Sequence, residues 1–556
     1  MARGTVGTER VTAFAPLRVP HYRRMWSAMV VSSLGTFLQM TVAPWLMQVM
    51  TGSPLLVSLV TTAMFLPRLL LILPSGVLAD ILDRRTMIVL GQLTSAVAVA
   101  SMTVLEVLGE LTPARLLVLT FVLGIGNAVT LPSLQTLIPD LVPRPMLAQA
   151  ITLQSAAGNV ARALGPSLGG ALAAMGLAHV AFGANAVSFL AVVGVVISFP
   201  RRRMESTYRR RLWRSTYVGW RYARFTPAIS RLLAVAGMFF LTAACVQALL
   251  PSLVSDELGL GAEWFGLLFG AFGSGALVGA LSRERVNALS PRKLLPGAIM
   301  GFGVSGVALG LATGPLTAGL PLFVNGACWV WTVTTLNASV QTLAPEWVRG
   351  RIVSLFLLMW GLQPIGAFLA GAVAEVAGAG LAVVILTGIT LLLGVGMLQA
   401  QLPSLSELKE ATPISDSLVV PGQPIEVGGA PILVMTTWEI HPDRMGEFMT
   451  VLRNLRRQRL RTGATRWSVF REASRPELVT EVFTLPDWQE HLAQHARLDE
   501  EAQSVISLAH AFDRNGEPRI RHLSGIDVSG RGAPSLEEQL VTVHEEFHER
   551  ERRRTR

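Results

Sequence analysis

Residues Ser133 to Val142 read SLQTLIPDLV, and the stretch returns 206 residues later as SVQTLAPEWV, from Ser339 to Val348. Seven of the ten positions are identical or exchange one acid for the other, with Asp140 in the first copy and Glu346 in the second. Each copy ends an apolar stretch and enters a polar one. A duplication at a fixed offset predicts two equivalent halves that follow one another along the chain.

The composition around this repeat is that of a membrane protein. Hydrophobic residues make up 51% of the 556 residues and charged residues 15%, the mean hydropathy is +0.48, and 51 residues are glycine. These values exclude a disordered, a collagen-like or a nucleic-acid-binding chain. Twelve apolar stretches are long enough to cross a hydrocarbon core of roughly 30 Å. They lie near residues 25–50, 55–79, 86–108, 115–138, 149–175, 180–199, 231–254, 263–282, 293–313, 316–343, 352–376 and 379–401.

These stretches predict an all-α membrane protein with twelve transmembrane helices in two six-helix halves, at residues 25–199 and 231–401. The preceding residues 1–24 are polar and contain no signal peptide. Lys and Arg gather in the loops on the side of the N-terminus, while the opposite loops hold only Arg115. The positive-inside rule then predicts a multi-pass protein of the inner membrane, with the lipid bilayer as partner and both termini in the cytoplasm. Residues 200–230 are interpreted as a basic cytoplasmic loop, with a lipid-headgroup site as the alternative.

Two motifs suggest helix contacts that change during function. The first, GVLADILDRR, runs from Gly76 to Arg85 after the second apolar stretch. Gly76 permits close helix approach, and the charges of Asp80, Arg84 and Arg85 could latch the cytoplasmic side. A short basic loop is expected at this place in any case.

The second motif, GNVARALGPSLGG, runs from Gly158 to Gly170 in the fifth apolar stretch. Its small residues remove side-chain bulk and one backbone donor, which predicts a pliable helix or, as the alternative, ordinary close packing. The candidate gating residues here are Gly165, Pro166, Gly169 and Gly170.

The six-plus-six pattern and these motifs resemble the major facilitator superfamily over roughly residues 20–401. More narrowly, the chain is similar to the bacterial exporters called transmembrane secretion effectors, the branch that includes the enterobactin exporter. The resemblance implies alternating access, and it assigns the residues above to the loop motif and to the antiporter motif of drug exporters. Asp83 and Ala161 stand where the family usually has glycine, a departure that bears on gating rather than on fold.

Two arginines lie inside apolar stretches, where a charge is costly and is therefore a candidate for function. Arg68 is near the middle of the second stretch and Arg162 near the middle of the fifth. Together with Asn127 and Asn159, they predict a site for an anionic or oxygen-rich small molecule. A structural role for both guanidinium groups is the open alternative.

Proton coupling requires a carboxylate that can change its protonation between two states. The candidates are Asp80 in the first half and Glu375 in the second, and either could be purely structural. That transport uses a proton gradient is implied by the resemblance. The chain lacks the GxxxxGK[ST] string of P-loop ATPases, and Cys245 and Cys328 form no metal-binding pattern, so we expect no cofactor and no metal.

Beyond residue 401 the chain changes character. Residues 402–556 hold 20 basic and 24 acidic residues, against 27 and 13 in residues 1–401. Residues 402–430 are predicted to be a linker and residues 529–556 a charged tail. Between them, residues 431–528 predict strands near 432–440, 465–472, 478–484 and 518–524 and helices near 443–461 and 487–512. This βαββαβ order predicts a small α+β ferredoxin-like domain.

The stretch WQEHLAQH, from Trp488 to His495, resembles the second helix of the dimeric α/β barrels that include the antibiotic-biosynthesis monooxygenases. That resemblance implies dimerisation through the C-terminal domain. His491 and His495 share a helix face and could bind a metal or support cofactor-free oxygenation. The favoured alternative is that they line the sheet or a subunit contact.

The sequence therefore predicts a secondary active transporter that exports an amphipathic small molecule, such as a siderophore or an antibiotic, and that has no catalytic residues. Proton antiport through alternating access is the implied mechanism. An uptake carrier shares the same pattern. The alternative from another class is a membrane-tethered enzyme whose C-terminal domain carries a monooxygenase-type activity.

Overall fold

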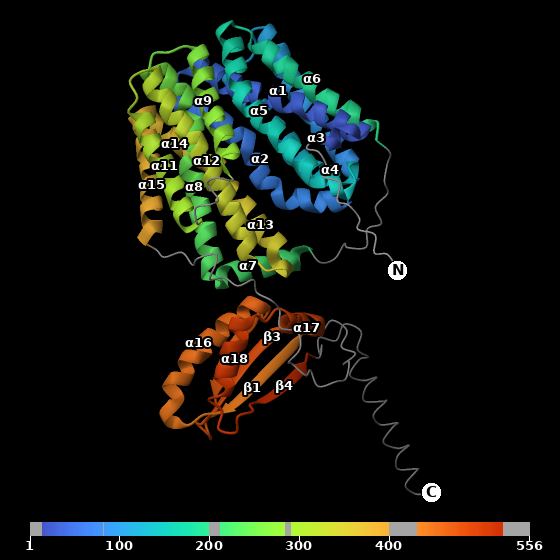
Figure 1. Ribbon diagram of the computed structural model, residues 1–556, viewed down its shortest axis with the longest axis vertical. Helices are drawn as coiled ribbons and strands as arrows, with labels where there is room; N and C mark the ends of the chain where they lie inside the picture. Colours follow the sequence, from blue (N-terminus) through green and yellow to red (C-terminus); the bar gives the residue numbers. More distant parts are fainter. Residues whose placement is uncertain (1–13, 82, 200–211, 284–290, 400–430, 526–556) are drawn as a thin grey trace, which may run out of the picture. The chain divides into compact units, whose positions relative to one another are not determined.

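The computed structural model describes residues 14–81, 83–199, 212–283, 291–399 and 431–525. The chain divides into two compact units, Met1–Glu410 and Ala411–Arg556. The first unit is helical and the second contains a sheet (Figure 1). The predicted linker at 402–430 and the predicted tail at 529–556 lie outside the described residues.

The first half of the helical unit consists of long helices joined by tight turns. Its elements are η1 (Ala15–Arg18), α1 (Pro20–Thr51), α2 (Pro54–Ile81), α3 (Arg84–Val107), α4 (Pro113–Leu141), η2 (Arg144–Met146), α5 (Leu147–Ala174) and α6 (Ala178–Ile197). Proline begins α1, α2 and α4, at a position where its missing N–H costs no helical hydrogen bond. Gly52, Gly109 and Gly176 close the turns after α1, α3 and α5 with φ values of 61°, 70° and 72°, a left-handed conformation that favours glycine.

The second half follows a short helix, α7 (Leu212–Phe225). Its elements are α8 (Pro227–Ser252), the π-helical turn η3 (Leu253–Glu257), α9 (Ala262–Leu281), α11 (Pro291–Gly310), α12 (Pro315–Leu343), α13 (Glu346–Trp360), α14 (Gln363–Ala377) and α15 (Ala379–Gln399).

The offset of 206 residues between the two decapeptides also relates the helices. Shifted by this offset, α1 to α6 fall in turn on α8, α9, α11, α12, the pair α13 and α14, and α15. The packing repeats as well, since α1 packs on α5 and α6 as α8 packs on α14 and α15. Likewise α3 packs on α4 and α6 as α11 packs on α12 and α15. The halves meet through two equivalent contacts, α5 with α9 and α2 with α14.

Eleven helical segments in the described residues are long and apolar enough to cross a membrane. Helix α5 does not meet this criterion, because Asn159, Arg162 and several glutamines and glycines lower the hydropathy of its 28 residues. It nevertheless packs against α1 and α9. The structure thus supports eleven of the twelve predicted spans by length and composition, and the remaining segment is a helix of lower hydropathy.

The continuity of one predicted span and one predicted loop of the helical unit are corrected. The span expected at 352–376 lies within one of these eleven segments, Glu346–Ala377. Its helix is broken between α13 and α14, where Gly361 and Pro364 flank the break and the proline lacks an N–H to continue the helix. The indole Nε1 of Trp360 donates to Gln363 Oε1 at 3.0 Å across this break. The region expected as a loop at 200–230 contains α7, which packs on α8 and α13.

The second unit is a four-stranded sheet packed against helices (Figure 1). Its elements are β1 (Ile432–Glu439), η4 (Pro442–Arg444), α16 (Met445–Thr462), β2 (Arg466–Arg471), β3 (Leu478–Leu485), α17 (Trp488–Ala496), α18 (Glu500–His510) and β4 (Arg519–Ser524). The strand order is β2-β3-β1-β4, and every neighbouring pair is antiparallel. Alternate residues of β1 and β3 are buried, and Trp438, Phe448 and Val479 belong to the apolar core beneath the helices.

The single helix expected at 487–512 is corrected to two helices, α17 and α18. The carboxylate of Asp499 accepts a hydrogen bond from the Ala502 N–H at 2.8 Å. An aspartate in this position caps the start of a new helix, so the chain is interrupted before it.

Candidate functional site

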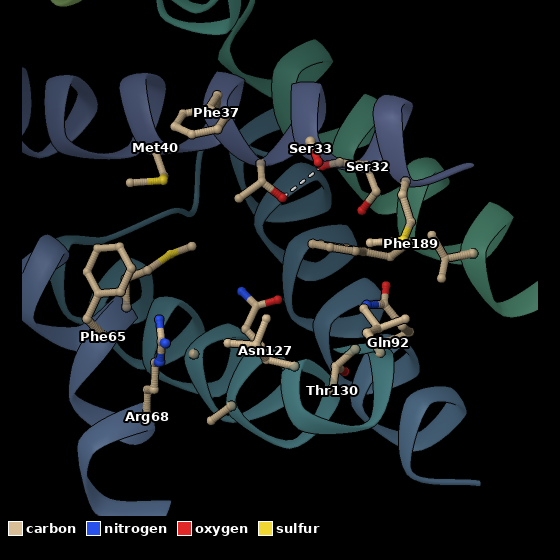
Figure 2. A pocket seen from close by; sticks show the side chains of 18 residues that line it. Ser32, Ser33, Phe37, Met40, Phe65, Arg68, Gln92, Asn127, Thr130 and Phe189 are labelled. Carbon is tan, nitrogen blue, oxygen red and sulfur yellow. Dashed lines mark hydrogen bonds between the residues drawn. The ribbon is translucent and has the colours of Figure 1, made fainter. Parts of the chain in front are cut away.

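A cavity of about 270 Å³ lies in the first half, between α1, α2, α3, α4 and α6 (Figure 2). Its wall combines polar groups with methionine, leucine and phenylalanine side chains. The lining residues are Met29, Ser32, Ser33, Thr36, Phe37, Met40, Met64, Phe65, Arg68, Gln92, Gly124, Asn127, Ala128, Thr130, Leu131, Leu134, Phe189 and Val192. No Asp or Glu is among these 18 residues. A mostly apolar hollow with a few convergent polar groups is typical of small-molecule sites.

Arg68 is the one charged residue of this lining set, and it also reaches the second half. Its guanidinium carbon lies 5.7 Å from the ring centre of Trp360, a cation–π distance. The Trp360 ring in turn stacks on Phe240 with a centroid distance of 5.4 Å and an interplanar angle of 4°. Trp360 is the last residue of α13, so Arg68 contacts the second half where the α13–α14 helix is broken.

Two amide side chains lie in the same cavity as Arg68. Figure 2 shows Asn127 of α4 between Arg68 on one side and Gln92 of α3 on the other. Gln92 is 4% exposed, and its buried Oε1 has no hydrogen-bond partner in the described part of the chain. Close packing of α4 on α2 is possible because a Cβ at Gly124 would lie 2.6 Å from the Met64 carbonyl oxygen.

The other two predicted binding residues, Arg162 and Asn159, lie on α5 and are absent from the lining of this cavity. The guanidinium carbon of Arg162 lies 5.7 Å from the ring centre of Phe37, whose side chain does line it. The structure therefore brings together Arg68 and Asn127, and it separates Arg162 from them by an aromatic wall residue.

The predicted antiporter motif lies where α5 meets α1 and α9. A Cβ at Gly165 would lie 2.5 Å from Phe37 Cβ, and one at Gly169 would lie 3.0 Å from the Leu38 carbonyl oxygen, both on α1. On the opposite side, a Cβ at Gly170 would lie 2.5 Å from the Cα of Gly266 on α9. The Pro166 carbonyl oxygen would lie 2.8 Å from a Cβ at Gly266. The small residues thus allow α5 to touch both halves at backbone distance.

The predicted loop motif spans the end of α2 and the start of α3. Gly76 and Asp80 lie in the last turns of α2, and Arg84 begins α3; their side chains lie outside the described set. Arg85 donates through Nη1 to the Phe199 carbonyl at 2.8 Å and through Nη2 to the Ile197 carbonyl. It therefore binds the C-terminal end of α6, where a cation is favourable.

Glu375 of α14 lies at the end of the bundle where α1 ends and α2 begins, called here the α1–α2 end. Its carboxylate accepts from Ser53 Oγ at 2.8 Å and from the Leu55 N–H at 3.1 Å, so it bonds the first turn of α2 from the other half. Nearby, Gln48 Nε2 donates to Asp256 Oδ1 at 2.7 Å. These bonds hold the halves together at the α1–α2 end.

The second unit contains a cluster of three histidines. His491 and His495 of α17 have their Nε2 atoms 3.2 Å apart, and the ring of His522 on β4 lies 4.8 Å from that of His491. Burial lowers the pKa of His491 to about 3 and that of His495 to about 4, with neighbouring positive charge adding to the effect. Burial also lowers the pKa of His522. No group of three or more His, Cys, Asp or Glu positioned for a metal occurs in the described residues.

A buried ion pair lies in the same core. Arg459 of α16 contacts Glu481 of β3 with Nε and Oε1 3.3 Å apart, and Glu481 is fully buried. The Trp467 indole donates to the same carboxylate at 2.6 Å. His522 and this ion pair were not predicted from the sequence, although the alternation of β3 and β4 places Glu481 and His522 on the sheet face that the helices cover.

The sequence profile of one family, described as transmembrane secretion effector, matches residues 11–529. The chain belongs to this family. The match covers both compact units of the transmembrane secretion effector, including all four strands of the sheet.

Two curated relatives of this chain are named as an efflux pump and an exporter. The multidrug efflux pump Tap of Mycolicibacterium fortuitum is 28% identical over 406 residues, which are 69% of this chain and 96% of Tap. The enterobactin exporter EntS of Salmonella typhi is 27% identical over 424 residues, which are 72% of this chain and 96% of EntS. About seven tenths of the chain therefore matches nearly the whole length of each relative.

Solved transporters share the fold of the membrane unit. The nucleoside transporter NupG aligns with a TM-score of 0.56 at 12% identity, over 70% of this chain and 100% of NupG. A bacterial homologue of the iron transporter ferroportin aligns with a TM-score of 0.55 at 17% identity, over 69% of this chain and 99% of the homologue. The transmembrane secretion effector is therefore a multi-pass membrane transporter of the major facilitator type, an efflux permease and not an enzyme.

Proposed function

We propose that the chain is a proton-driven exporter of amphipathic small molecules that carry acidic or oxygen-rich groups, such as a siderophore or an anionic antibiotic. The observation that carries this proposal is the first-half cavity, in which Arg68 and Asn127 meet and no carboxylate is among the lining residues. A cation in an apolar hollow attracts a ligand of opposite charge. The names of the relatives, a multidrug pump and an enterobactin exporter, agree with this substrate class.

We further propose that α5 is the twelfth span, so that both termini lie in the cytoplasm of a bacterial inner membrane. Packing of α5 on α1 and α9 supports the count, because α5 then occupies the place that α13 and α14 take in the second half. The α1–α2 end faces away from the cytoplasm in this orientation. Its bonds from Gln48 to Asp256 and from Ser53 to Glu375 would close the outer side, which fits an inward-facing state ready to receive substrate from the cytoplasm.

Glu375 is the proposed carboxylate for proton coupling or outer gating, with Asp80 as the candidate at the inner end of the first half. Protonation of Glu375 would remove the negative charge from the carboxylate and weaken the hydrogen bonds it accepts from Ser53 and from the first turn of α2. The bond that joins the halves would then weaken, which favours opening toward the outside.

For the second unit we propose a ferredoxin-like dimerisation module. The support is the βαββ order with a final strand and the sheet order β2-β3-β1-β4. The sheet face away from the core carries apolar side chains, with Phe470 58% and Leu523 47% exposed. A second copy of the same face would cover them.

The test is uptake into inverted membrane vesicles energised by a proton gradient, with enterobactin as the oxygen-rich probe. We expect Arg68→Ala to lower uptake about tenfold or more, the size expected when one charge-assisted bond is lost. Arg115→Ala, an exposed arginine that bonds Glu110, is the matched control and should leave uptake unchanged. Uptake that survives a protonophore would refute proton antiport, and full activity of Arg68→Ala would refute the cationic site.

A further inference from the structure

The two halves have the same helix arrangement but opposite interiors. The offset of 206 residues assigns each cavity-lining residue of the first half a partner in the second. Of the seven polar lining positions, five pair with apolar residues and two with hydroxyl residues. The apolar pairs are Ser32 with Met238, Ser33 with Phe239, Gln92 with Ala298, Asn127 with Val333 and Thr130 with Leu336, and the hydroxyl pairs are Thr36 with Thr242 and Arg68 with Ser274.

In the second half the equivalent interior is filled by aromatic rings. Phe239, the partner of Ser33, is fully buried. Its ring centre lies 5.2 Å from that of Phe302 and 5.5 Å from that of Trp329. Phe240 lies against the same tryptophan at 5.9 Å and stacks on Trp360. Polar side chains therefore line a cavity in the first half, where the described second half packs aromatic rings around Phe239.

The side chain of Gln92 leaves one hydrogen-bond acceptor of the cavity unsatisfied. A buried amide oxygen normally accepts a hydrogen bond, and leaving it unpaired is unfavourable. Gln92 is 4% exposed and its Oε1 is without a partner among the described residues, while its side chain lines the cavity. A ligand that donates an O–H or N–H would satisfy this oxygen.

Arg68 offers hydrogen-bond donors to a ligand, whereas the Gln92 oxygen offers an acceptor. A guanidinium group only donates hydrogen bonds, and it pairs best with the two oxygens of a carboxylate, sulfonate or similar acid. Figure 2 shows Arg68 and Gln92 on different sides of the cavity, with Asn127 between them. The remaining wall is largely apolar, with Met64, Phe65 and Phe189 among its members.

We propose that the first half alone recognises the polar part of the substrate. Arg68 binds an acidic group and Gln92 accepts from a hydrogen-bond donor on the same molecule, while the second half offers an apolar aromatic wall with Trp360 beside Arg68. This inference rests on the proposed export function, and it narrows the substrate to an amphipathic monoanion with an aromatic or apolar body and an O–H or N–H group. Amphipathic cations are excluded from the site.

Two dyes with one scaffold test this assignment. 6-Anilinonaphthalene-2-sulfonate has an aromatic body with an N–H at one end and a sulfonate at the other, and N-phenyl-2-naphthylamine has the same body and N–H without the acid. Binding is measured by equilibrium dialysis against the purified full chain in lipid nanodiscs, with empty nanodiscs subtracted. We expect Arg68→Ser to raise the Kd of the sulfonate about tenfold and to leave that of the neutral dye within about twofold. Gln92→Ala should raise the Kd of both dyes by about fivefold.

The repeat supplies matched controls. Ser274→Ala and Val333→Ala alter the second-half partners of Arg68 and Asn127 and should leave both Kd values unchanged. Arg68→Lys keeps the charge and should recover part of the sulfonate affinity, which separates recognition from a folding defect. The inference would be overturned by any of three results. The control variants lose as much dye affinity as the test variants, Arg68→Ser loses affinity equally for both dyes, or the parent does not bind the sulfonate. Enterobactin uptake by the parent in vesicles is read separately, so a failure of recognition is distinguishable from a failure of export.

Discussion

At the scale of single residues, the histidine cluster of the second unit makes its stability dependent on pH. Burial lowers the pKa of His491 to about 3, far below the ordinary value, so the folded unit keeps this ring neutral. The unfolded chain binds a proton as the pH falls below about 6.5. Stability is therefore complete above that pH and declines as the pH falls toward the folded pKa. For His491 alone the loss is about 2 kcal/mol at pH 5.

This pH effect is measured by hydrogen–deuterium exchange of the full chain, corrected for the intrinsic rate at each pH. Peptides from α17 and β4 should lose protection between pH 7 and pH 5, and His491→Phe should flatten the dependence because it removes the titrating ring. His441 is an exposed histidine beside Asp443, and His441→Ala should leave the profile unchanged. A profile that does not change with pH in the parent would contradict the burial of a neutral His491.

Single-residue function was only partly predictable from the sequence. Arg68 was identifiable because a charge within an apolar stretch is costly, and Asn127 followed as a polar residue at similar depth. Gln92 was missed although its amide lies within an apolar stretch as that of Asn127 does. Trp360 was missed because a lone aromatic residue in such a stretch gives no signal of a polar site. Arg162 gave the same signal as Arg68, but its ring contact with Phe37 depends on how α5 packs, which the sequence does not show.

At the scale of elements, the contact of α5 with α9 predicts unequal effects of two similar substitutions on one helix. A Cβ at Gly170 would lie 2.5 Å from the Gly266 Cα, whereas one at Gly158 meets nothing within 4 Å. Alanine favours a helix over glycine by about 1 kcal/mol in both places. We therefore expect Gly158→Ala to preserve or raise the thermal unfolding midpoint, and Gly170→Ala to lower it by several degrees, about what a loss of 1–3 kcal/mol of packing causes.

Transport of the two glycine variants is compared per mole of inserted protein. Gly170→Ala should slow uptake markedly, because α5 and α9 belong to different halves and must move against each other at backbone distance. If the two variants transported equally well, the α5–α9 contact would be ordinary packing and the proposed gating role of the motif would be wrong.

Most helices were predictable because a membrane helix needs a long apolar run that few other structures require. The exceptions have physical causes. Polar residues lower the mean hydropathy of α5. Its position was therefore predictable from the sequence, but its hydropathy is below that expected of a membrane span. Gly361 and Pro364 signalled the break between α13 and α14, whereas the Trp360–Gln363 bond across it could not be read from the sequence. Asp499 likewise signalled the start of α18 within a region that resembles one continuous helix.

At the scale of the whole molecule, one repeated decapeptide was enough to predict two equivalent bundles, because equal sequences at a fixed offset fold alike. It could not predict that the first half holds a cavity with polar lining residues where the second half packs aromatic rings around Phe239. That difference arises from residues such as Ser33 and Phe239, which occupy equivalent places and whose effect on the interior depends on every ring packed around them.

The lengths of the relatives predict that the second unit is dispensable for export. Tap and EntS are covered to 96% by about seven tenths of this chain, which is the share that the membrane unit occupies. Deletion of residues 411–556 should therefore leave the KM and the rate of enterobactin uptake within about twofold, since the cavity residues all lie in the first half.

The same deletion tests the proposed dimerisation module. The apolar sheet face around Phe470 and Leu523 is removed with it, so the particle mass in nanodiscs, measured by mass photometry, should fall from that of two chains to that of one. Phe470→Asp in the full chain is the finer variant and should dissociate the dimer while leaving the second unit folded, because Phe470 is exposed and a charge there is solvated in the monomer. A full-length chain that is monomeric would contradict the module, and a deletion that abolishes uptake would assign the second unit a part in transport that the shorter relatives do without.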